Sequence, residues 1–383
     1  MTHGNMPRPP PSKKPCAASS SSAGPFKEPW QFAVGNSLLN RQILRQMPEI
    51  SADPNTVSSA ATKLHRLRST LNQVLFGQET FIEAVLTGLL SRGHLLLEGL
   101  PGLGKTELVK GLARALEVKA RRVQFTPDLL PGDITGNPIL QEVDGRRQFV
   151  FQEGPIFANL VLADEINRAS PKTQSALLEA MQERRVTVMG ETHELPDPFF
   201  VLATQNPIEL EGTYPLPEAQ LDRFLFKLEV TRNSVSVLQQ IVQNRQIGVE
   251  PPVEPVMSAE ELIQLCDIAR TIHLPDVVAN YIARVIDATH EGNAADGVKF
   301  GASPRAAMAL AAAARSAALL AGRLNASFED VERLAAPVLQ HRIILDYTAR
   351  LAGKSPADVV RGILAAVPKQ DKPAPDVLKA AKL

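Results

Sequence analysis

The stretch of sequence that decides the fold reads Gly99-Leu100-Pro101-Gly102-Leu103-Gly104-Lys105-Thr106. The apolar run at residues 95–97 precedes it and predicts a buried parallel strand, and residues 107–116 follow with helical periodicity. A strand, a glycine-rich loop and a helix in this order form a phosphate-binding loop. The glycines let backbone N–H groups converge on a phosphate, and the helix presents its positive end to the same anion. We therefore predict that the chain binds a nucleotide here.

Two side chains at the end of this loop add chemistry that glycine lacks. Lys105 brings a positive charge near the β- and γ-phosphates, and the Thr106 hydroxyl is a ligand for Mg²⁺. The alternative is a glycine-rich turn that matches by accident, which average residue usage produces in about one chain of this length in a hundred. The strand and the helix beside the loop reduce that chance further.

The composition bounds the other possibilities. The chain has 383 residues, of which 44% are hydrophobic and 21% charged, and this is ordinary for a globular protein of two or three domains. Its formal net charge is zero, so no global basic field favours a nucleic-acid partner. Cys16 and Cys266 lack the spacing of a disulfide framework or a metal site. The N-terminus has no secretory apolar segment, and Arg315 interrupts the alanine-rich residues 306–322, so we expect a cytoplasmic protein without a membrane span.

The order of the predicted elements gives the domain organisation. Residues 1–54 are rich in Pro and Ser and predict a disordered tail, because such a segment buries too little apolar area to offset its ordering entropy. Residues 55–231 alternate buried strands with helices, which predicts a parallel sheet with helices on both faces. Strand signals vanish after residue 232, so residues 232–383 are expected to form an all-helical domain with a polar C-terminal end.

Hydrophobic periodicity places the individual elements. The predicted strands are residues 121–125, 159–165, 199–204 and 224–230, with hairpins at 139–151 and 186–195 and a loop at 125–136. The predicted helices are residues 54–72, 171–183, 234–245, 258–272, 275–288, 303–324, 327–345 and 355–366. Ser258 with Glu261, and Ser327 with Asp330, resemble capping boxes.

Paired acids end the predicted strand at residues 159–165. Asp164 can hold Mg²⁺, usually through water, and Glu165 can polarise an attacking water as general base. A solvated acidic turn is the alternative, but a long apolar strand that opens onto two acids behind a phosphate loop favours catalysis. Asn206 follows the next strand along the chain, where an amide can orient a water without adding charge. The alternative for Asn206 is a turn-forming residue before Pro207.

Four stretches follow one another on successive strand ends: residues 98–106, 160–165, 203–206 and 221–224. Their order resembles that of an AAA+ ATPase. Three longer runs resemble the MoxR family of these ATPases: ADEINRA at 163–169, QNP at 205–207 and GTYPLPEAQLDRF at 212–224. The resemblance covers about residues 74–366. It implies an α/β P-loop core followed by a helical lid, with ATP and Mg²⁺ as cofactors and a homo-hexameric ring as the active assembly.

The resemblance also implies roles for single residues. Asn206 corresponds to the sensor-1 residue, and Arg223 to the arginine finger that acts on the nucleotide of a neighbouring subunit; a surface salt bridge with Asp222 is the alternative for Arg223. Arg305 corresponds to the sensor-2 residue, which would contact the γ-phosphate of its own chain, or it is an exposed first-turn arginine. Arg168 is either a second arginine that acts on a neighbour or a solvated charge at a helix start.

Two further segments complete the predicted site. Gly77 and Gln78 correspond to a segment that lines the adenine pocket through its backbone. The hairpins at 139–151 and 186–195 correspond to inserts that face the central channel or the substrate side of a ring. Arg146 and Arg147 at the first tip could grip an acidic client, or they form a plain solvated tip.

The resemblance implies chaperone-like work on a client protein, often the insertion of a metal or the activation of an enzyme complex. A protein with a von Willebrand factor A domain is the expected partner. Three alternatives remain open: the ATPase subunit of a metal-chelatase-like complex, a DNA-directed AAA+ motor, and a nucleotide-switched scaffold without catalysis. Neutral net charge and the lack of a recognisable helix-turn-helix disfavour the DNA motor. The intact set of predicted catalytic residues disfavours the scaffold.

Overall fold

The computed structural model describes residue 1 and residues 53–99, 104–143, 146–206, 212–230, 232–246, 248–290 and 295–370. The chain divides into two units, Met1–Glu49 and Ile50–Leu383, and every element below belongs to the second. Several predictions lie outside the described residues: the tail before residue 53, the loop residues Leu100, Pro101, Gly102 and Leu103, the turn Asp144-Gly145, and residues 371–383.

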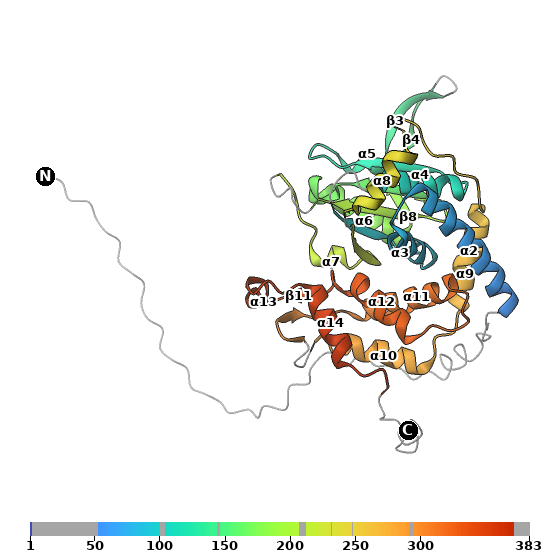
Figure 1. The fold of residues 1–383 in the computed structure, drawn as a ribbon. Coiled ribbons are helices and arrows are strands. Elements are labelled where there is room, and N and C mark those ends of the chain that lie inside the picture. The colour runs from blue at the N-terminus through green and yellow to red at the C-terminus, as the bar shows by residue number, and fades with distance from the viewer. Residues whose placement is uncertain are drawn as a thin grey trace, which may run out of the picture. The chain divides into compact units, whose positions relative to one another are not determined.

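A five-stranded parallel sheet forms the centre of the second unit (Figure 1). The strand before the phosphate loop lies inside this sheet, whereas the next strand along the chain lies at the far edge, so the strand order reverses there. Ligands of open α/β sheets bind at such a reversal. In spatial order the strands are β2 (Ala120–Gln124), β5 (Leu160–Asp164), β8 (Phe200–Gln205), β1 (Leu95–Glu98) and β9 (Phe226–Glu229).

Alternate residues of each strand belong to two different hydrophobic cores, because successive side chains of a strand point to opposite faces. Leu95 and Leu97 pack into the core on one face, and Leu96 between them packs into the core on the other. Helices therefore cover both faces, as predicted. The first core contains α2 (Pro54–Val74), α3 (Glu79–Leu90) and α4 (Lys105–Ala115), and the second contains α6 (Pro171–Glu183).

Helices dominate the chain after the sheet. The first core continues without a break from α2 and α3 into these helices, with α11 packed against both. Residues of this part form α8 (Val235–Asn244), α9 (Ala259–Thr271), α10 (Asp276–Asp287), α11 (Pro304–Leu320), α12 (Phe328–Leu339), α13 (Tyr347–Leu351) and α14 (Pro356–Ala366). The helices from α9 to α14 are called the lid below.

Two expectations for the second half of the chain need correction. The lid contains a small antiparallel sheet, β10 (Val298–Phe300) with β11 (Ile344–Leu345). Strands this short have no readable periodicity, so the sequence predicts only helices there. The helix predicted to reach residue 345 ends at Leu339, because β11 pairs across the chain with β10. The predicted domain boundary at residue 232 stays a prediction, and α8 lies beside the core: Arg245, its C-cap, donates to the carbonyls of Gln73 and Val74 at 2.6 and 2.8 Å.

Helix starts follow local capping chemistry. Ser258 and Ser327 each form the predicted capping box, at the starts of α9 and α12, and Ser355 forms another with Asp358 at α14. The side chain of Asp53 accepts a hydrogen bond from the N–H of Thr56 and caps α2. Such caps satisfy backbone donors that a helix start leaves unpaired.

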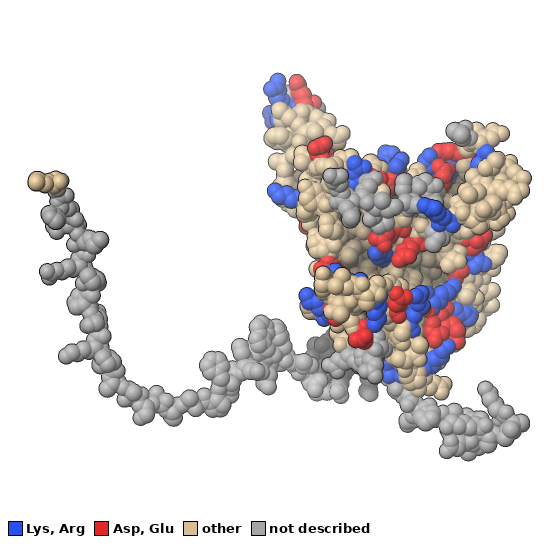
Figure 2. All heavy atoms as spheres, turned by 60° about the vertical axis from the view of Figure 1, so that its left-hand side comes forward, with Lys and Arg blue, Asp and Glu red and all other residues tan. Residues whose placement is uncertain are grey.

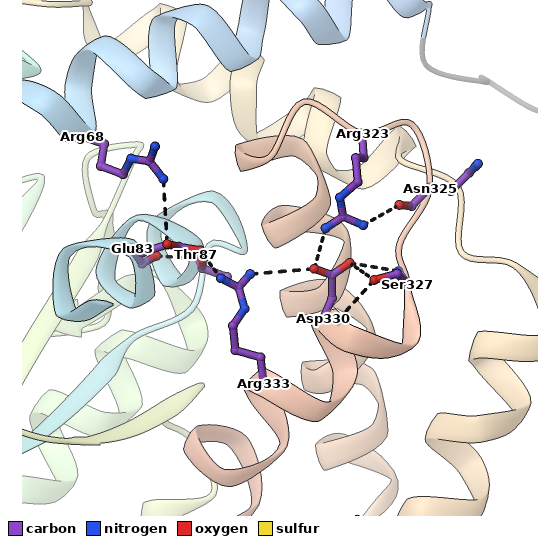
Figure 3. A network of polar contacts seen from close by, with 8 residues as sticks. All are labelled: Arg68, Glu83, Thr87, Arg323, Asn325, Ser327, Asp330 and Arg333. Carbon is purple, nitrogen blue, oxygen red and sulfur yellow. Dashed lines mark hydrogen bonds and ion pairs between the residues drawn. The ribbon is translucent and has the colours of Figure 1, made fainter. Parts of the chain in front are cut away.

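A polar network joins the lid to the core (Figure 3). Arg333 of α12 contacts Glu83 of α3, and the same carboxylate lies 3.8 Å from Arg68 of α2. Within the lid, Asp330 accepts from Arg323 at 2.6 Å and from the capping residue Ser327. The N-terminal half of α12 is thus fixed to two core helices by charged contacts as well as by apolar packing.

Two antiparallel hairpins extend from the core. The first projects away from the sheet in Figure 1 and pairs β3 (Gly136–Val143) with β4 (Arg146–Glu153), so that Leu140 faces Phe149. The second pairs β6 (Arg185–Val188) with β7 (Glu191–Glu194). Both were predicted. The predicted loop at 125–136 contains the short helix α5 (Pro131–Thr135). Two other short elements are η1 (Ile166–Arg168) and α7 (Glu218–Leu221).

Basic and acidic side chains are interspersed on the face seen in Figure 2, and among the described residues no continuous basic surface crosses that face. This mixed distribution agrees with the zero net charge of the sequence. Within the described ranges, no helix has both the length and the apolar character needed to cross a bilayer.

Candidate active site

A cavity of about 320 Å³ opens at the carboxyl ends of the central strands. It contains polar side chains from the strands β2, β5 and β8 or their ends and from the start of α4, which is where the strand order of the sheet reverses. We call it the phosphate pocket. Its lining residues are Gly99, Gly104, Lys105, Thr106, Glu107, Arg122, Gln124, Asp164, Glu165, Thr204, Gln205 and Asn206.

Gly99 and Gly104 are the described glycines of the phosphate loop. Gly104 caps α4 with a φ of +80°, and a Cβ there would lie 2.4 Å from the side chain of Leu75. Only glycine fits this left-handed, crowded position without strain. Lys105 Nζ donates to the carbonyl of Gly99 at 3.0 Å, which directs its ammonium group back over the loop. Burial lowers the pKa of Lys105, while the charges of Asp164 and Glu165 act to raise it.

Asp164 is the last residue of β5 and its side chain is buried. One carboxylate oxygen accepts from Arg122 Nε at 2.6 Å, and the other accepts from the Thr204 hydroxyl at 3.2 Å. The carboxylate therefore has a fixed orientation inside the phosphate pocket. The Thr106 hydroxyl group lines the same pocket, so the two predicted Mg²⁺ ligands lie around one cavity.

Glu165 follows directly and adopts a left-handed backbone, with φ +56° and ψ +50°. Its N–H donates to the Thr204 hydroxyl at 2.9 Å, and its carboxylate accepts from Gln124 at 2.7 Å and from Arg168 at 3.0 Å. A left-handed conformation is costly for a residue with a Cβ. The strand end is thus held in a strained turn that brings a second carboxylate into the phosphate pocket. Arg168 is engaged with this carboxylate of its own chain.

Asn206 directly follows β8, the strand next to β5, and lines the phosphate pocket together with the two acids. It is buried, and its carbonyl accepts from the Asn167 side chain at 3.4 Å. Asn206 is therefore near Asp164 and Glu165, as its place in the sequence predicts.

Sequence reasoning missed three residues that orient these acids: Arg122, Gln124 and Thr204. Arg122 and Gln124 lie on β2, where Gln124 pairs in register with Asp164. Thr204 lies on β8, one strand further along the sheet. The available signal was a polar residue at the end of each predicted strand. Using it requires the strand order, which the sequence does not state.

A second cavity of about 420 Å³ adjoins the phosphate pocket and shares Gly104 and Glu107 with it. Gln78 lines it, and the Gln78 side chain donates to Asn233 at 2.7 Å. Gly77 has a φ of +66° and packs against Val237 of α8 so closely that a Cβ would lie 2.2 Å from it. The segment predicted to line the adenine pocket therefore borders a cavity beside the phosphate loop. The lining residues on its other side were missed, because a helix end and the loop after it have no motif: Asn233, Ile241, Arg245, Gln246, Gly248, Val249, Glu250 and Pro251.

Residues 222–225, which include Arg223, are called the arginine turn below. Of the described residues, those that line the phosphate pocket do not include Arg223; it borders instead a separate cavity of about 410 Å³ beside α6. Within the described ranges Arg223 forms no ion pair, and its neighbour Asp222 pairs with two lid residues instead: Arg342 at 2.7 Å and Arg305 at 3.3 Å. The alternative of a salt bridge between Asp222 and Arg223 is therefore not what this geometry contains.

The sensor-2 role that the family resemblance implies for Arg305 stays a prediction. Arg305 lies in the first turn of α11, pairs with Asp222 and shares a small cavity with Arg223, and it does not line the phosphate pocket. The first turn of α11 faces the arginine turn.

Comparisons with known proteins agree with this geometry. Residues 94–226 match the model of the ATPase family associated with various cellular activities, and residues 290–363 match the AAA lid domain. The chaperone MoxR1 of Mycobacterium tuberculosis is 42% identical over 352 residues, which cover 87% of this chain and 92% of that protein. The protein MoxR of Paracoccus denitrificans is 31% identical, over 76% of this chain and 91% of its own length. A crystal structure from Cytophaga hutchinsonii, of a protein described as an ATPase, superposes with a TM-score of 0.75 at 37% identity, covering 82% of this chain and 96% of that one.

Proposed function

Because this chain belongs to the MoxR family of AAA+ ATPases, we propose that it hydrolyses ATP with Mg²⁺ in a ring of identical subunits and uses that energy to remodel a client protein. The single observation that carries the proposal is the division of charged groups between two places. The acids and the loop lysine share the phosphate pocket, while Arg223 and Arg305 lie together outside it. We infer that Arg223 and Arg305, which lie outside the pocket of their own chain, reach the nucleotide of a second copy.

Within the phosphate pocket each residue has a proposed task. The N–H groups at the start of α4 and the Lys105 ammonium bind the phosphates. Thr106 and Asp164 are a fitting donor set for Mg²⁺, since hydroxyl and carboxylate oxygens are the ligands it takes, and the bound ion would neutralise charge on the phosphates. Glu165 accepts the proton of the attacking water, and Asn206 orients that water by donating and accepting hydrogen bonds.

Arg223 supplies positive charge to the γ-phosphate bound by a neighbouring subunit, with Arg305 beside it. In related phosphoryl transfers an arginine supplied from another chain accelerates the reaction by about 10³-fold or more. A contact of one surface patch with a different patch on the next copy closes into a ring when the rotation permits. We propose a homo-hexamer on the family resemblance.

The names of the MoxR relatives support a chaperone role for this chain. We propose that the client is a protein complex whose activation, including metal insertion, needs mechanical work, and that a protein with a von Willebrand factor A domain is the partner that presents it. The two hairpins are the proposed client-facing elements.

Mixing two inactive variants tests the division of the active site between subunits. Glu165→Gln lacks the base in its own pocket, and Arg223→Ala lacks the group that it lends to a neighbour. Each should be inactive alone. Mixed rings should regain part of the wild-type turnover, because some interfaces then combine an intact Glu165 with an intact Arg223. Wild-type turnover from Arg223→Ala alone, with no dependence on protein concentration, would contradict the proposal.

A further inference from the structure

Three consecutive residues after α12 turn towards the arginine turn and its strand. Gln340 donates to the carbonyl of Lys227 at 2.6 Å, and His341 Nε2 donates to the carbonyl of Phe224 at 3.0 Å. Arg342 follows them. The residues directly after α12 therefore contact the segment that carries Arg223, although about 120 residues of chain separate Arg342 from Asp222.

Arg342 binds the residues on both sides of Arg223. Its Nε donates to the carboxylate of Asp222 at 2.7 Å, and its Nη2 donates to the carbonyls of Asp222 and Phe224 at 3.2 and 2.7 Å. Its Nη1 donates to the carbonyl of Leu225 at 3.1 Å. The side chain is only 3% exposed, and it also donates from Nη1 to the carbonyl of Val338 on α12. Arg342 is thus a buried charge, and four of these five hydrogen bonds go to the arginine turn.

The guanidinium is well suited to this task. Its five donors lie in one rigid plane, so it can fix several acceptors at once, whereas a lysine ammonium is a point charge on a flexible stem. A buried charge persists only when it is paired and hydrogen-bonded. The turn and the arginine therefore hold each other in one arrangement, and Arg223 leaves that turn with a defined direction.

We propose that Arg342 is the positioning residue for Arg223: it fixes the arginine turn to the end of α12, so that the lid of one subunit sets the place of the arginine which that subunit lends to its neighbour. The inference rests on the proposed function, since it assigns Arg342 a part in delivering Arg223. Arg342 itself does not contact the phosphate pocket. A displacement of about 1 Å in such a group costs about 10²-fold in rate.

The helix that precedes Arg342 offers a matched control. Arg333 lies on α12 and, like Arg342, bonds to a carboxylate of the core, but that carboxylate is Glu83 on α3 (Figure 3). Arg333→Met removes an arginine contact between lid and core without touching residues 222–225. Arg342→Met removes the contact to the arginine turn. The pair separates a general loosening of the lid from a displaced Arg223.

The experiment measures kcat and the Michaelis constant for ATP, and then mixes variants in one ring. Arg342→Met should lower kcat about 10²-fold and leave the Michaelis constant within about twofold, because its own phosphate pocket is intact. Mixed with Glu165→Gln it should regain turnover, since that partner supplies a well-placed Arg223. Mixed with Arg223→Ala it should regain none, because both partners fail as donors of the arginine. Arg333→Met should keep kcat within about twofold.

Two results would overturn the inference. The first is regained turnover with Arg223→Ala but not with Glu165→Gln, which would locate the defect in the pocket of the Arg342 variant itself. The second is an equal loss in Arg333→Met, which would assign the effect to the lid as a whole. If Arg342→Met fails to assemble, Arg342→Lys carries the test: it should lose about tenfold in kcat with the same pattern of mixing.

The reference mixture keeps the two proposals apart. If Glu165→Gln and Arg223→Ala regain no turnover together, the shared active site fails and the role of Arg342 falls with it. If they regain turnover together but Arg342→Met does not show the same pattern of mixing as Arg223→Ala, only the proposed role of Arg342 is wrong.

Discussion

In the phosphate pocket, the acids and the residues that orient them lie on strands that pair along one sheet or directly after them, whereas Arg223 lies on a turn outside the sheet. Asp164 is held by Arg122 and Thr204, from strands on either side of β5. The arginine turn is held from the lid, by Arg342, His341 and Arg305. The first region keeps its geometry as long as the sheet is intact. The second depends on how the lid packs against the core, so it is the half of the proposed site that a conformational change can move.

The largest effects should come from the pocket, and they should divide into binding and chemistry. Lys105→Ala should weaken ATP binding by about 2–5 kcal/mol, because the loop loses its buried phosphate-directed charge. Glu165→Gln should bind ATP normally and lose about 10²–10⁴-fold in kcat, because an amide cannot accept the proton. Calorimetric affinity and single-turnover hydrolysis measure the two. Normal turnover by Glu165→Gln would show that Glu165 is not the general base. The phosphate pocket would then not be the region that carries the chemical step.

Acid should affect the arginine turn before the pocket. Burial lowers the pKa of His341 to about 3, with the charges of Arg342 and Lys227 acting in the same direction, and burial lowers the pKa of His94 to about 4. Both folded values lie below the ordinary 6.5, so the unfolded chain binds protons first and stability falls as the pH drops below 6.5. From pH 6.5 to pH 5 each histidine should cost about 2 kcal/mol of unfolding free energy.

Denaturant titrations at several pH values measure this loss. His341→Gln keeps a donor for the carbonyl of Phe224 and has no group that titrates in this range, so it should reduce the pH dependence by about one proton. Amide exchange at residues 222–225 should rise at a higher pH than exchange in α4. If α4 lost its protection at a higher pH than residues 222–225, the prediction that acid affects the arginine turn first would be wrong.

Arg305→Ala should have a smaller effect on kcat, and it acts at the arginine turn rather than in the phosphate pocket. Its pair with Asp222 is half exposed and worth at most about 1 kcal/mol. Asp222 keeps Arg342, so the arginine turn should stay in place. We expect kcat to fall about tenfold, about 1.4 kcal/mol, if the charge of Arg305 joins Arg223 at the neighbour. Regained turnover with Glu165→Gln is the supporting result. Regained turnover with Arg223→Ala would instead show that Arg305 acts on the nucleotide of its own chain.

The smallest effect is expected from the N-terminal tail, which belongs to neither region. Deletion of residues 1–30 should leave the melting temperature and the basal ATPase rate unchanged, because their Pro- and Ser-rich composition cannot support a core. Thermal melts of the shortened and the full chain measure this. A fall of several degrees would show that the tail stabilises the body of the protein.

The success of sequence reasoning follows the same division as the site. The strands β1, β5 and β8 are apolar runs buried on both faces, so these strands and the acids that end one of them could be predicted to within about two residues. Arg122 could not, because its role depends on which strand lies next to β5. Arg342 could not either, because its partners at residues 222–225 are about 120 residues away in sequence. Contacts of that kind belong to tertiary packing, and no local pattern encodes them.

The left-handed backbone of Glu165 sets a conflict between durability and activity at that position. Such a conformation costs a residue with a Cβ about 1–2 kcal/mol, which exceeds the roughly 1 kcal/mol that a partly exposed pair such as Glu165–Arg168 returns. Glycine there would be the more stable choice and would have no carboxylate. A library of variants selected only for heat resistance should therefore accumulate glycine at position 165, and its most robust members would be the ones that no longer turn over ATP.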